Sequence, residues 1–276
     1  MVSESDKKFQ RYFSGAECIG DDFSKEQIIA WFDDEAEGYA TLGAKNRNQY
    51  RYVYHAWNKK HGFSRLPNMR YKNVLGMGSA YGDEFYPIID RIERITILDP
   101  SKHFETKEIK GVPIAYKNPN VSGEIPFEEG SIDLLTCFGV LHHIPNVSYV
   151  VKEFGRVLSS EGIALIREPV VNMGDWRKPR KGLTARERGI PVHIMEEAIA
   201  KSGLKILART PCDFPILSRL SHLIGIHEPY NSNILVSLDM VLSRLFYYNT
   251  QYNRNGLLGR ICPCSVFWVC KKTGRI

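Results

Sequence analysis

The chain has 276 residues, of which 43% are hydrophobic, 11% aromatic and 25% charged. A chain of this length and composition can bury a full core in one or two domains, which excludes a disordered or collagen-like protein. Its six cysteines are too few and too scattered for a disulfide framework, so we expect a reducing compartment. Because the sequence has neither a run of about 18 apolar residues nor the apolar core of a signal peptide, it predicts a cytoplasmic protein without a membrane span.

The net charge of +6 is concentrated in one segment. Residues 177–188 contain six arginines or lysines and a single acid, Glu187, so they account for five of the six positive charges. Charge confined to one loop argues against a protein that coats nucleic acid, and we do not expect a nucleic-acid partner.

The first 70 residues are predicted to be helical. Ser24 and Gln27 form a capping box ahead of the first apolar run. Apolar residues at helical spacing between positions 50 and 57 predict a second helix. The two glycines in residues 38–43 predict a loop or hinge between these helices.

From Tyr71 onward, short β-branched runs alternate with helical patterns. We expect strands at residues 73–75, 95–98, 132–137, 163–166 and 204–208, and helices at residues 84–86, 147–158 and 194–202. Strands separated by helices form right-handed crossovers. The pattern therefore predicts an α/β fold with a doubly wound, mostly parallel sheet.

Residues 213–260 interrupt this alternation and are predicted to be helical, ahead of a final strand at residues 265–270. Such an insertion either covers the ligand crevice at the carboxyl ends of the strands or packs as a helical pair at the edge of the sheet, and the sequence leaves both open. The apolar side chains between residues 234 and 246 share one helix face. Since the polar side of this helix lacks the lysines of a membrane-surface helix, we expect the apolar face to pack on the core.

A glycine-rich turn follows the first predicted strand. Gly76, Gly78 and Gly82 allow backbone N–H groups to approach a ligand closely. Asp99 ends the next strand, where a carboxylate can accept hydrogen bonds from a ribose diol. These features alone suit a dinucleotide as well as other adenosine-containing cofactors.

Together with two downstream stretches, this pattern resembles the class I S-adenosylmethionine-dependent methyltransferases. The stretches are residues 124–133 and 138–144, and all four markers occur in order between Tyr71 and Pro211. The resemblance implies a single Rossmann-like methyltransferase domain with a seven-stranded sheet and S-adenosylmethionine as cofactor. It divides residues 1–276 into a helical cap (1–70), a cofactor-binding core (71–212 and 261–276) and an insertion or lid (213–260).

Two positions depart from the family pattern. Ala80 replaces the second glycine of the loop, and Gly76 stands where the family has an acid that helps to orient the amino-acid end of the cofactor. The resemblance assigns cofactor binding to Gly76, Met77, Gly78, Ser79, Gly82, Asp99, Pro100, Ser122, Phe138, Gly139 and Val140.

Methyl transfer to a hydroxyl needs positioning of the two substrates and a base that takes the hydroxyl proton. His142 and His143 follow a strand end beside the expected crevice and are the candidate bases. Glu168, at the end of the next strand, is a candidate either to orient a histidine or to bind a substrate hydroxyl. Candidates for binding an anionic acceptor are the loop residues Arg177, Arg180 and Arg186.

We expect O-methylation of a small polar acceptor, such as a sugar or a secondary metabolite. The alternatives are N- or C-methylation of a metabolite and a catalytically inactive, cofactor-binding partner subunit, the latter because Gly76 replaces the loop acid. Cys262, Cys264 and Cys270 lack the spacing of a tetrahedral zinc site, so no metal is predicted. The sequence does not indicate an oligomeric state.

Overall fold

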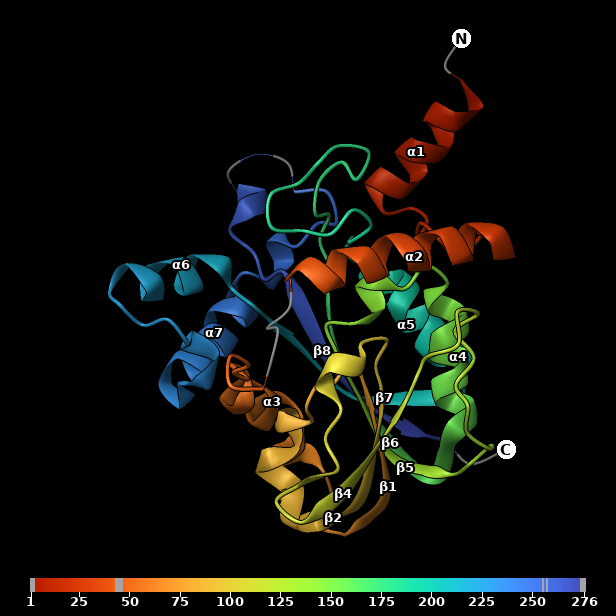
Figure 1. Ribbon diagram of the computed structural model, residues 1–276. Helices are drawn as coiled ribbons and strands as arrows, with labels where there is room; N and C mark the ends of the chain where they lie inside the picture. Colours follow the sequence, from red (N-terminus) through yellow and green to blue (C-terminus); the bar gives the residue numbers. More distant parts are fainter. Residues whose placement is uncertain (1–2, 43–46, 255, 257, 274–276) are drawn as a thin grey trace.

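A single sheet forms the centre of the fold. The computed structural model describes residues 3–42, 47–254, 256 and 258–273. The strands are β1 (Tyr71–Met77), β2 (Ile92–Leu98), β3 (Glu108–Ile109), β4 (Val112–Lys117), β5 (Ile132–Phe138), β6 (Leu158–Pro169), β7 (Leu204–Cys212) and β8 (Ser265–Lys272). They are arranged in the order β3-β4-β2-β1-β5-β6-β8-β7 (Figure 1).

The sheet has the predicted architecture, doubly wound and mostly parallel. Strands β4, β2, β1, β5 and β6 run parallel, whereas β8 pairs antiparallel with both β6 and β7. Seven strands thus form the doubly wound, mostly parallel sheet, and the eighth, β3, is a two-residue edge strand antiparallel to β4. The strand order reverses between β1 and β5, and open α/β sheets bind ligands beside such a switch point.

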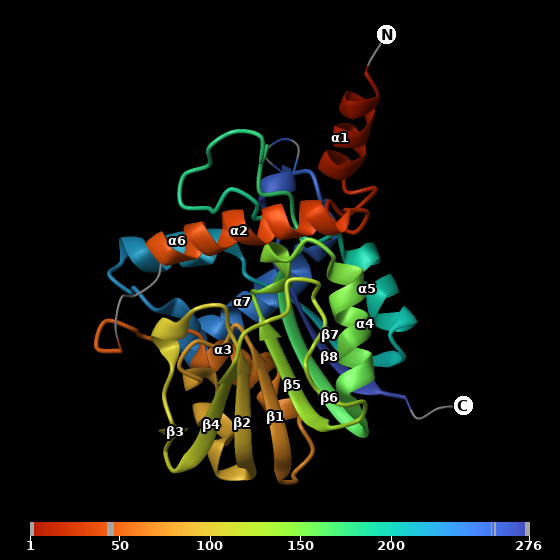
Figure 2. The ribbon, with the colours of Figure 1, turned by 45° about the vertical axis from the view of Figure 1, so that its right-hand side comes forward.

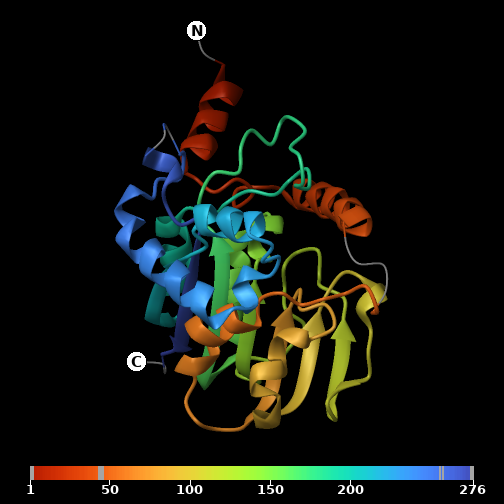
Figure 3. The same ribbon diagram turned by 90° about the vertical axis from the view of Figure 1, so that its left-hand side faces the viewer.

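Helices cover both faces of the sheet (Figures 2 and 3). The α-helices are α1 (Glu4–Ser14), α2 (Lys25–Leu42), α3 (His55–His61), α4 (Val147–Val157), α5 (Val192–Lys201), α6 (Pro215–Leu223) and α7 (Asn233–Leu245). Helices α4 and α5 lie on one face, and α3, α7 and the 3₁₀ helix η2 (Asp83–Arg91) lie on the other. Each face has its own core, with Phe154 buried in the first and Phe85 in the second.

Helix α2 lies across the carboxyl ends of the strands (Figure 2). The predicted capping box is confirmed: the Ser24 N–H donates to Oε1 of Gln27 at 2.9 Å, and the Gln27 N–H donates to Oγ of Ser24 at 3.3 Å. The predicted loop at residues 38–43 is wrong for residues 38–42, because α2 continues through them to Leu42. Gly43 lies outside the described residues.

Two further helix predictions are corrected. The helix expected from position 50 begins only at His55, and the chain before it has no regular structure. The helix expected at residues 84–86 is the 3₁₀ helix η2, which contains Pro87. Proline has no N–H to donate and so disfavours an α-helix there.

Residues 213–260 contain a helical pair beside the sheet. Helix α7 contacts both β7 and α3. Asp239 of α7 is buried, and its carboxylate accepts hydrogen bonds from the N–H groups of Asp213 (3.1 Å) and Phe214 (2.6 Å) at the end of β7. None of the described residues in this segment borders the cavity at the strand ends. The geometry therefore favours packing at the sheet edge over a lid.

The apolar face of α7 faces solvent, so the prediction that it packs on the core is wrong. Ile234 is 80% and Leu245 61% exposed, whereas Asp239 and Ser243 are buried. The hydrogen bonds of Asp239 to the chain after β7 turn the polar side of the helix inward.

All six cysteines are free thiols. Within the described ranges, no helix combines the length and apolar character needed to cross a bilayer.

Candidate active site

A cavity of about 350 Å³ lies at the carboxyl ends of β1, β2 and β5, against α2. Trp31 and Glu35 of α2 border it on one side, and Gly78, Asp99 and His143 border it from the loops after the strands. Its lining is mostly apolar with a few polar groups, which is typical of a site for a small molecule.

The register of the sheet places the glycine turn beside Asp99. Met77 pairs with Leu98 at the ends of β1 and β2, and the Gly78 N–H donates to the Leu98 carbonyl oxygen at 2.8 Å. Gly78 has a φ of +59°, and a Cβ at this position would lie 2.7 Å from Cγ2 of Val140. Glycine is therefore required here, and its bare backbone borders the cavity.

Asp99 is almost buried at the cavity wall. Its carboxylate accepts hydrogen bonds from the N–H groups of Ser101 (2.9 Å) and Ala80 (3.3 Å). Burial raises the pKa of Asp99 to about 6, although both hydrogen bonds act to lower it. An ionised carboxylate has about four acceptor positions, so Asp99 can still accept hydrogen bonds from ligand hydroxyls.

A buried carboxylate holds the glycine turn. The hydroxyl groups of Ser79 and Thr136 both donate to Oε1 of Glu84, at 3.0 Å and 2.5 Å. Burial raises the pKa of Glu84 to about 7, against these hydrogen bonds, which lower it. A Cβ at Gly76 would lie 2.3 Å from Oγ of Ser79. The turn is thus held by a carboxylate from η2, and position 76 has no room for the acid of the family pattern.

The structure divides the predicted cofactor residues into two groups. Those that border the cavity are Met77, Gly78, Asp99, Pro100 and Val140, and those outside its lining are Gly76, Ser79, Gly82, Ser122, Phe138 and Gly139. The Ser122 carbonyl oxygen accepts a hydrogen bond from Nδ2 of Asn146 at 2.7 Å. Asn120 does border the cavity and offers a side-chain amide there. The sequence analysis missed it because no motif marks it.

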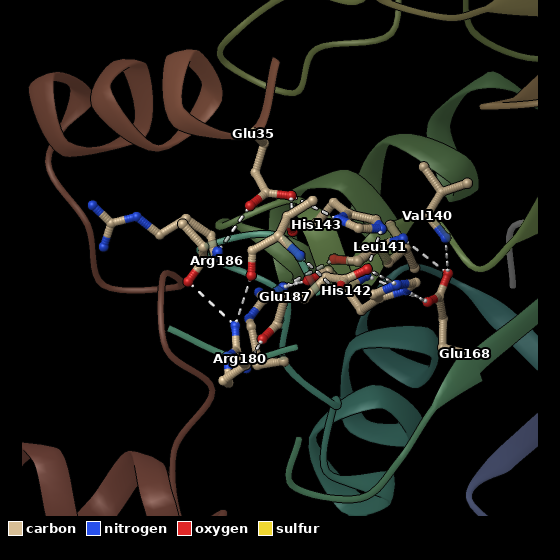
Figure 4. Close-up of polar contacts among 12 residues, drawn as sticks. Glu35, Val140, Leu141, His142, His143, Glu168, Arg180, Arg186 and Glu187 are labelled. Carbon is tan, nitrogen blue, oxygen red and sulfur yellow. Dashed lines mark hydrogen bonds and ion pairs between the residues drawn. The ribbon is translucent and has the colours of Figure 1, made fainter. Parts of the chain in front are cut away.

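Glu168 fixes the loop that carries both histidines. This residue is fully buried, and its carboxylate accepts hydrogen bonds from the N–H groups of Val140 (2.9 Å), Leu141 (2.8 Å) and His142 (3.3 Å) (Figure 4). Nδ1–H of His142 donates to it at 2.8 Å. Burial raises the pKa of Glu168. The hydrogen bond and positive charge of His142, together with the backbone hydrogen bonds, lower it more, so the pKa of Glu168 lies below its usual value. Glu168 does not border the cavity and is a positioning residue, which corrects its predicted alternative role of binding a hydroxyl.

His143 borders the cavity and is held by α2. Its Nδ1–H donates to Oε2 of Glu35 at 2.7 Å, and its carbonyl oxygen accepts from the Trp31 indole N–H at 2.7 Å. Burial lowers the pKa of His143, and the neighbouring His142 lowers it further.

Glu187 faces both histidines (Figure 4). Its Oε1 lies 3.7 Å from Nε2 of His142 and 3.3 Å from Nε2 of His143, and the two ring centroids are 4.0 Å apart. Burial lowers the pKa of His142, but hydrogen bonds with Glu168 and Glu187 raise it more, so the pKa lies above its usual value. We refer to His142, His143 and Glu187 as the imidazole–carboxylate cluster.

The three loop arginines have partners within the protein. These are Asp175 for Arg177, the carbonyl oxygens of Thr184 and Glu187 for Arg180, and Asp34 for Arg186, at distances of 2.6–3.0 Å. None of the three arginines borders the cavity. Because their guanidinium groups already bind the loop and α2, the geometry gives no support to their predicted contact with the acceptor.

Arg167, which ends β6 beside Glu168, is a buried cation without a carboxylate partner. It is 7% exposed, and its Nη1 donates to Oδ1 of Asn58 at 2.9 Å. The guanidinium carbon lies 4.3 Å from the ring centroid of Trp57 and 4.7 Å from that of Tyr54. Over the described part of the chain, no carboxylate lies within 4.0 Å of its nitrogens. Nη2 lies 3.9 Å from the place of a Cβ on Gly139, at the end of β5.

Glu35, Glu187 and Arg167 were missed or set aside by the sequence analysis. Glu35 looks like one charge among several on an amphipathic helix. Glu187 did carry a signal, because it is the single acid among the basic residues 177–188.

Residues 75–166 match the family model of a methyltransferase domain. A search of curated protein sequences finds no match.

Solved structures share the fold at low sequence identity. A provisional S-adenosylmethionine-dependent methyltransferase from Listeria monocytogenes has a TM-score of 0.55 at 14% identity, over 80% of this chain and 99% of that one. The phosphoethanolamine N-methyltransferase 2 of Haemonchus contortus, solved with phosphomonomethylethanolamine and S-adenosylhomocysteine, has a TM-score of 0.53 at 16% identity, over 91% of this chain and 58% of that one. The [4+2]-cyclase SpnF has a TM-score of 0.52 at 14% identity, over 90% of this chain and 93% of that one. At these identities the likeness shows the fold alone.

Proposed function

The chain belongs to the class I S-adenosylmethionine-dependent methyltransferases, and from this premise we propose that it methylates an oxygen of a small polar acceptor that carries an anionic group. The observation that carries this proposal is the imidazole–carboxylate cluster, of which His143 borders the cavity while His142 and Glu187 lie outside its lining. A hydroxyl loses its proton when it accepts a methyl group, and the cluster lies where a base is needed. A sugar or secondary metabolite with a carboxylate or phosphate is the favoured acceptor.

The cavity fits the adenosyl half of S-adenosylmethionine. Asp99 offers carboxylate oxygens to the ribose hydroxyls, and Gly78 lets the backbone approach without a side chain. Leu98, Val121 and Ile125 offer an apolar lining for the flat base. When bound, this cofactor supplies a methyl group that its positive sulfur has already activated.

The carboxylate of Glu84 weakens the alternative that the protein is a catalytically inactive partner subunit. That alternative depended on the missing acid at Gly76. Since Glu84 holds Ser79 and Thr136 from a different element, the turn keeps a buried carboxylate, and the argument for an inactive protein becomes weaker.

In this proposal the chain positions the acceptor and receives its proton. Glu168 binds Nδ1–H of His142 and so orients the loop, whereas Glu35 binds Nδ1–H of His143, whose lowered pKa keeps the ring neutral, so that its Nε2 carries a lone pair that can accept a proton. Because the donor is already activated, positioning is the main contribution of the protein, and a general base adds roughly 10²–10⁴-fold.

Arg167 also lies outside the cavity lining, but unlike the three loop arginines its side chain has no carboxylate or backbone carbonyl partner among the described residues, and we propose it as the residue that binds the anionic group. Buried charges are normally paired, because moving an unpaired charge from water into the protein interior costs roughly several kcal/mol. The guanidinium of Arg167 has one neutral partner, Asn58, within the described residues. A carboxylate or phosphate would complete it with two parallel hydrogen bonds. The Haemonchus contortus neighbour, solved with a phosphate-bearing small molecule, is consistent with an anionic acceptor on this fold.

The test is an acceptor screen. The protein is incubated with S-adenosylmethionine and pairs of acceptors that differ only in an anionic group, such as a hexose and its uronic acid. We expect S-adenosylhomocysteine to form with the anionic member, and the product to carry a methyl ether by mass spectrometry and NMR. Donor binding without turnover, or a methyl group on nitrogen or carbon, would contradict the proposal.

The six free thiols are consistent with the cytoplasm, the location we propose.

A further inference from the structure

Two ring nitrogens and a carboxylate oxygen converge in the imidazole–carboxylate cluster. Nδ1 of His142 lies 2.8 Å from Glu168, and Nδ1 of His143 lies 2.7 Å from Glu35. An ionised carboxylate only accepts hydrogen bonds, so each Nδ1 carries a hydrogen, and in its neutral form each ring offers the Nε2 lone pair to a metal ion. One ligand atom from each of His142, His143 and Glu187 lies within 4.8 Å of the other two.

This convergence offers three ligand atoms to a cation. Oε1 of Glu187 lies 3.3 Å from Nε2 of His143 and 3.7 Å from Nε2 of His142. The surrounding charge also favours a cation, since three carboxylates (Glu35, Glu168 and Glu187) face two arginines (Arg180 and Arg188). Both of those guanidinium groups donate to backbone carbonyl oxygens of the same loops.

We propose that His142, His143 and Glu187 bind a divalent first-row transition metal ion through the two Nε2 atoms and the carboxylate. Two imidazoles and one carboxylate are a ligand set of zinc and non-haem iron sites that keep an open position. Around a tetrahedral ion with bonds of about 2.1 Å, ligand atoms stand roughly 3.4 Å apart, which matches the 3.3 Å and 3.7 Å separations. Among the residues that the structure describes, this is the one group of three such side chains with ligand atoms so close.

Glu168 and Glu35 supply what the ligating histidines of a metal site need. Such a histidine almost always donates its other ring N–H to a carboxylate, a carbonyl or water, which fixes its tautomer and orientation. Glu168 is itself held by three backbone N–H groups. Glu35 is held by the Thr184 hydroxyl (2.8 Å) and the Arg186 N–H (2.9 Å). Both rings are therefore preorganised before any ion binds (Figure 4).

Metal binding does not depend on the identity of the acceptor, whereas its consequence for catalysis rests on the proposed function. Among the three ligands His143 borders the cavity, whereas His142 and Glu187 do not, so an ion in the cluster would lie beside the cavity wall next to His143. There it could bind the acceptor oxygen and lower the pKa of the hydroxyl. The metal would then replace an imidazole as the group that makes deprotonation favourable.

The test is metal binding by the full-length protein, without a histidine tag and after treatment with a chelator. Titration with Zn²⁺ is followed by calorimetry, and titration with Co²⁺ by visible absorption. We expect one equivalent of each ion to bind. Glu187→Gln should weaken Zn²⁺ binding by at least about tenfold, and Glu35→Gln, which alters a residue behind the ligands, by about 10–100-fold. The matched control is the double variant His193→Gln/Glu197→Gln on the exposed face of α5, which should bind like the wild type.

The proposal is overturned if no saturable binding of Zn²⁺ or Co²⁺ occurs, or if Glu187→Gln and the wild type bind Zn²⁺ equally. Circular dichroism establishes that each variant is folded, and Glu35→Gln provides a second variant if Glu187→Gln is not. The acceptor screen on metal-free protein separates the two proposals. Full turnover without metal would leave the proposed function standing and remove the metal from it. Zn²⁺ binding with no turnover on any anionic hydroxyl acceptor would support the metal site and contradict the proposed function.

Discussion

Nδ1 of His143 lies 2.7 Å from the carboxylate of Glu35, a residue 108 positions earlier in the chain. The same carboxylate accepts hydrogen bonds from Thr184 and Arg186. Glu35 thus joins α2, the loop after β5 and the basic loop at one point on the cavity wall. Helix α2 is therefore part of the site.

Replacement of His143 tests the role of the cluster in the reaction. We expect His143→Gln to lower turnover by roughly 10²–10⁴-fold, because the acceptor proton loses the group that makes its removal favourable. Binding of S-adenosylhomocysteine, measured by calorimetry, should change little. His193→Gln, an exposed histidine on α5, is the control and should keep full turnover. Wild-type turnover in His143→Gln would exclude this role.

The carboxylate of Asp99 should dominate donor affinity. A hydrogen bond to a charged group contributes about 1.5–3 kcal/mol, so Asp99→Asn should weaken S-adenosylhomocysteine binding by roughly 10–100-fold. Glu93→Gln, an exposed residue of β2, is the control. An unchanged dissociation constant in Asp99→Asn would place the adenosyl group elsewhere.

The same residue predicts a pH dependence. The pKa of Asp99 is raised to about 6, so the carboxylate is ionised at neutral pH and becomes protonated as the pH falls through that value. Donor affinity should therefore fall below about pH 6, by at most about tenfold per pH unit. Calorimetry across this range checks the wild type, and the Asp99→Asn variant should lack this inflection.

Glu168 should matter for stability through the bonds that it accepts. Glu168→Gln places an amide N–H₂ among buried N–H donors, so we expect the free energy of unfolding to fall by about 2–4 kcal/mol. Urea unfolding measures it. Glu161→Gln at the exposed start of β6 should change stability by less than about 1 kcal/mol. Because the pKa of Glu168 is lowered in the folded state, its contribution is present at neutral pH and is lost as the pH falls toward that pKa.

Arg167 should decide between anionic and neutral acceptors. Arg167→Met should raise the KM of the anionic acceptor by about tenfold or more while the KM of a neutral analogue stays similar, and Arg167→Lys should restore part of the difference. Arg177→Gln, whose arginine pairs with Asp175 on the surface, should leave both KM values unchanged. An equal loss for both acceptors in Arg167→Met would indicate a structural role only.

Gly76 should not tolerate a side chain. Gly76→Ala places a Cβ 2.3 Å from Oγ of Ser79, so we expect a loss of about 1–3 kcal/mol of stability and weaker donor binding. The double variant Gly76→Ala/Ser79→Gly removes the clash and should recover part of the stability. Failure of any recovery would mean that the strain lies elsewhere in the turn.

The sheet could be predicted from the sequence because its central strands are short and almost wholly apolar, as Ile163–Ile166 within β6 shows. β4 (Val112–Lys117) was missed because Pro113 and the preceding Lys110–Gly111 look like a turn. The orientation of α7 could not be predicted, since the two hydrogen bonds that Asp239 accepts come from a segment about 25 positions earlier, and the spacing of apolar residues along the helix does not indicate them.

The candidate site was predictable only where its residues form a local pattern. The glycine turn, Asp99 and the histidine pair are such patterns. Glu35 and Arg167 meet the rest through tertiary contacts between distant segments, and no spacing in the sequence marks them, whereas Glu187 is marked only as the single acid of the basic loop. The predicted contact of the basic loop with the acceptor has no support for a related reason. Arg177, Arg180 and Arg186 are each already bound to a carboxylate or a carbonyl oxygen of the protein, which the sequence does not show.

A crystal structure with bound S-adenosylhomocysteine tests the central proposal most directly. We expect the ribose hydroxyls on the carboxylate of Asp99 and the sulfur on the side of the cavity that His143 and Glu35 border. A nucleoside bound away from Asp99, or a sulfur that faces away from His143, would contradict it.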